Sequence, residues 1–372
     1  MYRACRGYAI RPEGTHYFAR AGITGQAGEI HIKTTQEALI MIFQHIDFHN
    51  VAEAEPFEGG WRLWRVPAEV RAKANQGLKE RTAAYSTGIE LRFVMVSDTV
   101  TIRLRSVPIA EGQMAYLYFG SLQGGWQQSS YIITNEVTEI RISKPGNMAQ
   151  LQQLTADAAL PFDPQVVRLV LPYGNIIFHG MEGEVRPPVA EMLPKTTLLS
   201  YGSSITHGSL ALAAPYTYPF RIAQKLGSDY LNCGFAGTAL CDRAIAEWIV
   251  SRRDWHFATL EMGVNMLGMD EKEFEARVDE FTGILADDGR PVFATSIFCT
   301  GGERRGVPSR NDTFRAIVRR YAEKRMHFID GLELLDRPEL ISQDMVHPSL
   351  EGIAQIVDRW TPFIRERLPE KL

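Results

Sequence analysis

The hydrophobic pattern of the chain changes near its midpoint, and this change constrains the fold more than any other feature. From about residue 8 to residue 182, apolar residues alternate with polar ones, as where Leu91 and Phe93 flank Arg92. Alternation of this kind has the period of strands that bury one face. Beyond about residue 196, short apolar runs instead alternate with longer amphipathic segments. The pattern predicts two regions of different structural class.

The first region carries a series of short runs with the strand period. The runs at residues 89–93 and 100–104 are separated by a break at residues 97–99 that suits a hairpin turn. Further runs lie at residues 114–119, 131–133, 137–142, 166–171 and 176–178. We therefore expect an antiparallel β-sandwich domain over residues 1–183.

A proline-rich stretch ends the first region. Pro187 and Pro188 are followed closely by Pro194. Because proline lacks an N–H donor and has a fixed backbone angle, this stretch suits neither a helix interior nor a central strand. We expect residues 184–195 to be a linker and residues 196–372 to form the second domain.

The second region predicts an α/β fold. Its strand-like runs lie at residues 197–201, 230–232, 257–262, 292–298 and 327–329. Its helix-like segments lie at residues 219–226, 244–251, 271–285, 311–324 and 350–367. Five such βα units imply a parallel sheet covered on both faces, with a site at the carboxyl ends of its strands.

Composition narrows the class of partner. The 372-residue chain is 45% apolar, which is enough to bury a core in each of two domains. Charged residues make up 23% and the net charge is -4, so there is no basic excess to neutralise nucleic acid or an anionic membrane. No apolar stretch is long enough to cross a bilayer. We expect neither partner, and whether the chain forms a homo-oligomer stays open.

The cysteines and the N-terminal residues indicate the cellular compartment in which the protein resides. Residues 1–14 contain three arginines but lack the uninterrupted apolar run of a secretory signal. The cysteines show no CxxC pair and no spacing typical of a disulfide framework or a zinc site. We expect buried thiols in a reducing cytoplasm. The four are Cys5, Cys233, Cys241 and Cys299.

The first predicted strand of the second region ends in a serine-containing turn, Gly202-Ser203-Ser204-Ile205-Thr206. A serine at such an exit from a strand can present its hydroxyl as a nucleophile and its backbone N–H as an oxyanion donor. A serine before a helix is more often an N-cap, and the pentapeptide alone favours the cap.

An aspartate and a histidine stand three residues apart near the C-terminus, just before a predicted helix. Asp344 can accept a hydrogen bond from Nδ1 of His347 while Nε2 faces a serine. A capped helix with an exposed histidine explains the pattern equally well.

Two glycine-containing turns follow the second and third predicted strands. Gly237 offers a backbone N–H where a side chain would clash, and Asn265 offers a side-chain amide. With Ser204 they would form a three-donor oxyanion hole. Taken separately, both are ordinary glycine turns.

These four blocks, in this order and at strand ends, resemble the SGNH hydrolases, also called GDSL-type esterases. The resemblance runs from about Thr196 to the C-terminus and implies a flavodoxin-like three-layer α/β/α domain with no metal or organic cofactor. By position it implies that Ser204 is the nucleophile and that Asp344 and His347 are the acid and the base. It also implies that the oxyanion donors are Ser204, Gly237 and Asn265.

One position departs from the family. The family's common Gly-Asp-Ser is Gly202-Ser203-Ser204 here, so the residue before the nucleophile lacks a carboxylate. That acid is not the triad aspartate, so the mechanism survives while the local hydrogen bonding changes. We choose Ser204 because it aligns with the third position of Gly-x-Ser-x-Thr.

Three competing interpretations are disfavoured. The α/β-hydrolases use Gly-x-Ser-x-Gly with the acid far from the histidine, whereas Thr206 replaces the second glycine here. His207 is close to Ser204, but no acid adjoins it, so we expect it to line the pocket. A row on one predicted strand could hold a metal, although a solvated strand face is the more frequent explanation. That row is His45, Asp47 and His49.

A β-sandwich before an SGNH-like domain resembles some carbohydrate esterases and bacterial GDSL-type acyl esterases with a jelly-roll-like N-terminal domain. Residues 162–180 are similar to the join found there. The resemblance implies a serine esterase acting on acetyl or other short acyl esters of a carbohydrate or small natural product. An acyltransferase with the same triad remains an alternative, and a non-catalytic carbohydrate-binding protein is less favoured because Ser204, Asp344 and His347 are intact.

Overall fold

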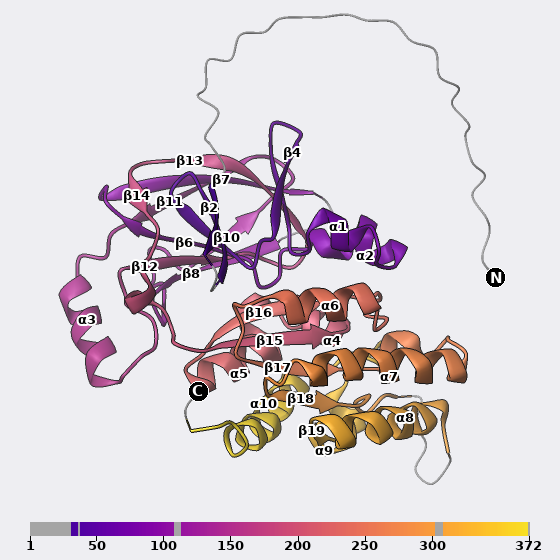
Figure 1. The fold of residues 1–372 in the computed structure, drawn as a ribbon. Helices are drawn as coiled ribbons and strands as arrows, with labels where there is room; N and C mark the ends of the chain where they lie inside the picture. Colours follow the sequence, from indigo (N-terminus) through magenta and orange to yellow (C-terminus); the bar gives the residue numbers. More distant parts are fainter. Residues whose placement is uncertain (1–30, 36–37, 108–112, 302–307, 371–372) are drawn as a thin grey trace, which may run out of the picture.

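The computed structural model describes residues 31–35, 38–107, 113–301 and 308–370. Within them the chain forms a β-rich N-terminal part and an α/β C-terminal part, which are stacked on each other in Figure 1. Cys5 and the arginine-containing residues 1–14 lie outside the described residues.

The N-terminal part contains two antiparallel sheets. The first has the spatial order β1 (His31–Thr35), β2 (Ala38–Phe43), β3 (Ile46–His49), β6 (Glu90–Met95), β12 (Val166–Val170), β8 (Gln113–Phe119) and β10 (Ser130–Ile133), with β14 (Val185–Arg186) on β6 and β9 (Leu122–Gln123) on β8. The second has the order β11 (Thr138–Ser143), β7 (Thr99–Val107), β13 (Asn175–Glu182), β5 (Gly60–Trp64) and β4 (Glu53–Phe57). Phe93 of the first sheet and Phe178 of the second belong to one buried cluster, so the sheets enclose a common core.

The turn at residues 97–99 is not the hairpin that the sequence suggested, because β6 and β7 belong to different sheets. The sequence also suggested that only one face of β6 is buried. Glu90 and Arg92 are 0% and 1% exposed, so the polar side of this strand is buried as well. The alternation along β6 marks a second buried face, which meets the C-terminal part through Arg92 and Asp229.

The proline-rich boundary begins with paired residues. Val185 and Arg186 form β14, opposite Met95 and Val94 of β6. The boundary expected at residues 184–195 therefore starts while the chain is still attached to the first sheet. Short helices that the sequence did not predict also occur in the N-terminal part: α1 (Ala68–Arg71), α2 (Gln76–Glu80) and α3 (Met148–Asp157).

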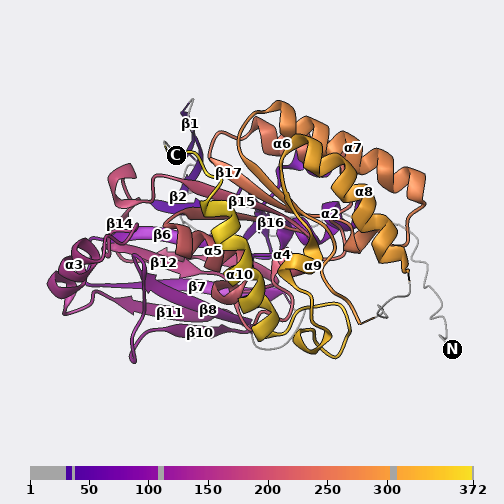
Figure 2. The same ribbon diagram turned by 90° about the horizontal axis from the view of Figure 1, so that it is seen from below.

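The C-terminal part is built on a parallel sheet with the order β16 (Asp229–Gly234), β15 (Thr197–Gly202), β17 (Phe257–Glu261), β18 (Val292–Thr295) and β19 (His327–Ile329). One face is covered by α5 (Tyr218–Leu226), α9 (Gly331–Leu334) and α10 (Leu350–Arg365). The other is covered by α6 (Arg243–Ser251), α7 (Glu271–Asp287) and α8 (Arg310–Arg325), as Figures 1 and 2 show. The predicted α/β fold class is confirmed.

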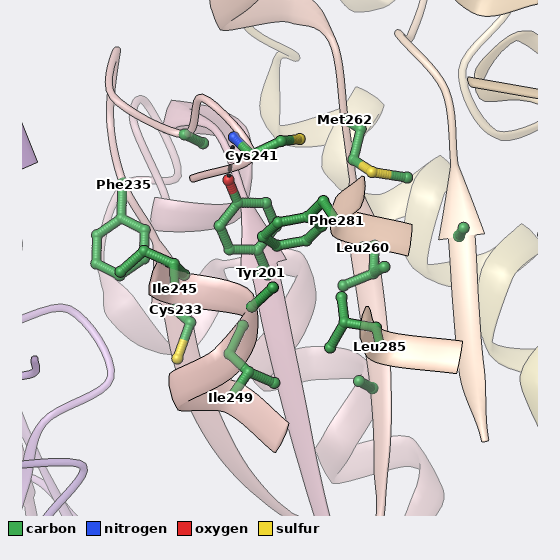
Figure 3. Close-up of a cluster of buried hydrophobic side chains, with 14 of the residues drawn as sticks. Tyr201, Cys233, Phe235, Cys241, Ile245, Ile249, Leu260, Met262, Phe281 and Leu285 are labelled. Carbon is green, nitrogen blue, oxygen red and sulfur yellow. Dashed lines mark hydrogen bonds between the residues drawn. The ribbon is translucent and has the colours of Figure 1, made fainter. Parts of the chain in front are cut away.

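The core on the α6–α8 face holds the central strand in place. Figure 3 shows Tyr201 of β15 among buried side chains of neighbouring strands and helices. Its ring centroid lies 4.6 Å from that of Phe281, and its hydroxyl accepts a hydrogen bond of 3.0 Å from the Cys241 N–H. The end of β15, which leads into the turn with Ser204, is thereby anchored by both packing and a buried hydrogen bond.

A buried ion network joins the two parts. Arg92 of β6 binds both carboxylate oxygens of Asp229 on β16 at 2.6 and 2.7 Å, and its Nε donates to Glu90 at 2.8 Å. Arg168 of β12 also binds Glu90, at 2.6 and 2.7 Å. Burial alone would raise the pKa of Asp229 and Glu90, but the guanidinium groups hold both pKa values below the usual range.

Two further expectations concern the burial of the cysteines and membrane-spanning segments. Cys233, Cys241 and Cys299 are all buried, as expected for core thiols. Among the described residues, no helix has the length and apolar character that a membrane span requires.

Candidate active site

Three sequence-predicted residues gather where neighbouring parallel strands end. Ser204 follows β15, Gly237 follows β16, and Asn265 follows β17. The chain passes from β15 to β16 on one side and then to β17 on the other, which is a topological switch point of an open α/β sheet. Such a point leaves a crevice at the carboxyl ends of the strands.

The sequence left open whether the serine of this turn is a nucleophile or a helix N-cap, and the structure assigns the cap to the neighbouring serine. Ser203 is the N-cap of the one-turn helix α4 (Ser204–His207), and its side chain accepts a hydrogen bond of 3.1 Å from the Ile205 N–H. Ser204 is the first helical residue, so its hydroxyl is not used for capping. That hydroxyl lies 2.7 Å from Nε2 of His347, which is 143 residues away in sequence.

His347 is held on its other side by Asp344. The distance between His347 Nδ1 and Asp344 Oδ2 is 2.6 Å. Oδ1 of Asp344 accepts from the backbone N–H groups of Val346 and His347 and from the Ser342 hydroxyl. Burial opposes ionisation of this carboxyl, but these hydrogen bonds prevail and hold its pKa well below the usual range. A carboxylate, an imidazole and a hydroxyl are thus connected in series.

The candidate oxyanion loops are linked to each other. Asn265, in the 3-10 turn Val264–Met266, uses its amide oxygen to accept a hydrogen bond of 3.3 Å from Ala239 in the Gly237 loop. Its Nδ2 group remains a donor for a bound substrate. Gly237 has φ +73°, and a Cβ there would meet no atom closer than Arg81 Nη2 at 3.9 Å. The expected clash is therefore wrong, and the left-handed backbone is the reason for glycine.

Glu261, at the end of β17, is a residue that the sequence analysis missed. Its Oε2 accepts 2.7 Å from the Ser203 N–H and 3.2 Å from the Thr206 hydroxyl, and the side chain is buried. Burial raises the pKa of this carboxyl. The carboxylate that position 203 lacks is thus replaced by one from the adjacent strand. A glutamate within the apolar run at residues 257–262 was the available signal.

His207 does not line an open pocket, contrary to expectation. It is 0% exposed, and its ring lies 4.4 Å from that of Tyr173 and 5.4 Å from that of Tyr85, both from the N-terminal part. Its Nδ1 accepts 3.3 Å from the Ala236 N–H, next to Gly237. Burial lowers its pKa well below the usual value, so the ring is neutral and braces the Gly237 loop.

In the row at His45, Asp47 and His49, His45 is exposed in the turn before β3, whereas the other two residues do not lie on a solvated strand face. Asp47 is 7% exposed, and burial raises the pKa of its carboxyl. The His49 Nε2 lies 2.7 Å from the Tyr230 carbonyl oxygen in β16. These two side chains belong to the junction between the parts, and the described residues contain no group of three side chains arranged to hold a metal ion.

A family model of the GDSL-like lipase/acylhydrolase family matches residues 200–354, which include the serine turn, the oxyanion loops and the loop at residues 342–347, called the histidine loop below. The C-terminal domain belongs to this family. This domain is accordingly of the GDSL-type ester hydrolase class. No curated protein matches the sequence at a significant level.

Solved structures share the whole two-part arrangement. The salicylyl-acyltransferase SsfX3 from a tetracycline biosynthetic pathway is 16% identical, with a TM-score of 0.68 over 87% of this chain and 95% of that chain. A GDSL-like lipase, so described, from Bacteroides ovatus is 18% identical, with a TM-score of 0.61 over 89% and 96%. A family two carbohydrate esterase from Cellvibrio japonicus is 11% identical, with a TM-score of 0.55 over 87% and 95%. At these identities the similarity establishes the fold alone.

Proposed function

We propose that the chain is a serine esterase in which Ser204 is the nucleophile, His347 the general base and Asp344 the residue that orients His347. The observation that carries the proposal is the unbroken series of contacts from the Ser204 hydroxyl to His347, at 2.7 Å, and on to Asp344, at 2.6 Å. Both distances lie within hydrogen-bond reach of a nucleophile and its base.

The geometry supports an acyl-enzyme route. His347 takes the Ser204 proton as Oγ bonds to the acyl carbon, and the N–H groups of Ser204 and Gly237 with the Asn265 amide stabilise the oxyanion. The C–O bond to the alcohol then breaks, and the alcohol leaves with the proton from His347. Water attacks the acyl-enzyme by the same steps, which releases the acid and restores Ser204. No cofactor takes part in the proposed reaction.

The proposed substrates are acetyl or other short acyl esters of a carbohydrate or a small natural product. Support comes from the shared fold with a carbohydrate esterase. An acyltransferase using the same residues is the second candidate, because a structure of similar architecture is a salicylyl-acyltransferase. The two candidates differ only in whether water or an alcohol reaches the acyl-enzyme.

Labelling with a fluorophosphonate tests the nucleophile, because only an activated hydroxyl attacks this reagent quickly. We expect one label per chain, on Ser204 by peptide mass spectrometry, with loss of turnover. Ser204→Ala should stay unlabelled, whereas Ser203→Ala, the matched control, should still react. A label on Ser203 would contradict the assignment. Assays of acyl esters with and without alcohol acceptors then separate hydrolase from transferase.

A further inference from the structure

A cavity of about 530 Å³ lies between the N-terminal and C-terminal parts, beside α4. The N-terminal part contributes Thr87, Met114, Pro172 and Tyr173 to its lining, and the C-terminal part contributes residues 208–214 and Thr217. The proposed catalytic residues are not among its lining residues, although the lining begins at Gly208, four residues after Ser204.

The cavity begins one helical turn from the proposed nucleophile. The N–H groups of Gly208 and Ser209, which line it, both donate to the Ser204 carbonyl oxygen at 2.9 Å. One α-helical turn rises about 5.4 Å, so the cavity starts roughly 6 Å from Ser204 along α4. A substrate bound at Ser204 can therefore extend a side group into it.

Two walls of the cavity are leucines in an unusual conformation. Leu210 and Leu212 have φ +63° and +60°, and their side chains are 56% and 70% exposed. Bulky residues seldom adopt this left-handed region, and such outliers collect at ligand sites. Burial cannot explain why apolar side chains are held here, because neither leucine is buried. A ligand that covers them would explain it.

Of the two buried threonines in the cavity wall, Thr217 donates to the Ala214 carbonyl oxygen, whereas Thr87 has no such bond. Thr87 is 1% exposed, and its Oγ1 makes no hydrogen bond to the described residues. Tyr173, on the same wall, accepts a hydrogen bond of 3.2 Å from the Ser209 hydroxyl. Apolar walls with a few placed polar groups, in a volume of this size, are typical of small-molecule sites. A buried hydroxyl left without a protein partner is costly, and a ligand group can satisfy it.

We infer that this cavity binds an aromatic-sized apolar group of the ester substrate, and that Thr87 hydrogen-bonds a polar substituent on that group. This inference rests on the proposed esterase function and names its substrate class. The substrate is an ester with such a group about 6 Å from the ester carbon, on either its alcohol or its acyl side. A small acetate or an acetylated sugar alone would leave the apolar walls uncovered.

Binding and turnover test the inference separately. Calorimetry with Ser204→Ala protein measures binding of 2-phenylethanol and 3-phenylpropanoate without catalysis. With active protein, the kcat/KM of phenethyl acetate is compared with that of ethyl acetate, and that of ethyl 3-phenylpropanoate with that of ethyl propanoate. We expect at least one phenyl ester to be preferred and at least one of the two ligands to bind.

Variants locate the site. Leu212→Asn should reduce the phenyl preference and the ligand affinity roughly tenfold. Leu154→Asn changes an equally apolar, half-exposed leucine on α3 and should alter neither. Thr87→Val should abolish any preference for a 4-hydroxyphenethyl over a phenethyl ester, whereas Thr87→Ser should keep it.

The outcomes distinguish two failures. If esters are turned over through Ser204 but no phenyl ester is preferred, or Leu212→Asn and Leu154→Asn behave alike, the cavity inference is wrong and the esterase proposal stands. If no ester is turned over while the phenyl ligands bind in a Leu212-dependent manner, the cavity is a ligand site and the esterase proposal is wrong. Absence of both binding and preference overturns the cavity inference.

Discussion

The two loops that carry the proposed chemistry are held in place by different means. In the serine turn, Ser203 donates to Glu261, 58 residues away, and the Thr206 carbonyl accepts from the Asn232 amide at 3.0 Å. In the histidine loop, the hydrogen-bond partners of Asp344 that the structure describes all lie within three residues of it, and its side chain is 41% exposed. The nucleophile is positioned by the folded core, whereas the base is positioned mainly by its own short segment, to which the Gly301 N–H adds one hydrogen bond at the Met345 carbonyl oxygen.

Replacing His347, the proposed base, is the strongest test of this contrast between the two loops. We expect His347→Ala to lower kcat by roughly 10³ or more, because the proton acceptor for Ser204 is lost. The melting temperature should stay close to that of the unchanged protein, because the loop is exposed and locally bonded. Steady-state kinetics on an acyl ester and thermal melting measure the two effects.

The matched control for this prediction is His45→Asn, an exposed histidine with φ +64° whose backbone conformation asparagine tolerates. It should keep full kcat. His207→Ala should instead lower the melting temperature, because the ring is buried between two tyrosines. Near-normal kcat in folded His347→Ala would refute the assignment of the base.

This contrast also explains what the sequence could predict. Asp344 and His347 stand three residues apart, so their relation is visible in the linear chain. The five strands and the five longest helices of the C-terminal part were predicted because each has its own hydrophobic period, whereas the one-turn helices α4 and α9 were not predicted. Ser203 and Glu261 come together only through the register of β15 against β17, and no local pattern encodes that pairing.

The junction between the parts misled the sequence analysis for the same reason. Glu90, Arg92 and Asp47 are polar residues at alternating positions, which normally indicates a solvated strand face. Here that face is buried against Asp229 of the C-terminal part. Polarity was mistaken for exposure because the partner charge lies 137 residues away along the chain.

Changing Asp344 tests whether local bonding is enough to hold the base. Asp344→Asn should lower kcat by about 10² to 10⁴, since an amide cannot stabilise the imidazolium as a carboxylate does. The amide oxygen can still accept from Val346 and His347, so we expect the loop to keep its shape and KM to change little. Ser342→Ala, which removes only one bond to Asp344, should cost less than tenfold. Equal losses in both variants would contradict the role given to the carboxylate.

Changing Glu261 tests the other half of the comparison. Glu261→Leu removes the acceptor for the Ser203 N–H, and we expect kcat to fall about tenfold with little change in KM, because the turn rather than the binding site shifts. Glu261→Gln retains an amide oxygen and should recover much of the loss. A fall in melting temperature without any change in kcat per folded molecule would mean that Glu261 only stabilises the core.

The smallest expected effect is the contribution of His207, at the end of helix α4, to the pH dependence of stability. His207 is completely buried, which lowers its pKa in the folded protein well below the 6.5 of an unfolded chain. As pH falls through 6.5, this histidine becomes protonated in the unfolded chain but stays neutral in the folded protein, so the free energy of unfolding decreases. From pH 8 to pH 6 the loss from this one histidine is about 1 kcal/mol.

A matched variant isolates that contribution. His256 and His327 also have lowered pKa values, from burial and nearby arginines, so the unchanged protein reports a sum of histidine effects. Denaturant unfolding of His207→Gln and of the unchanged protein at pH 8 and pH 6 gives the difference between them. We expect the variant to be less stable at both values but to lose about 1 kcal/mol less on acidification. An identical pH dependence would mean that His207 accepts its proton in the folded state, and that helix α4 is less firmly buried than the structure indicates.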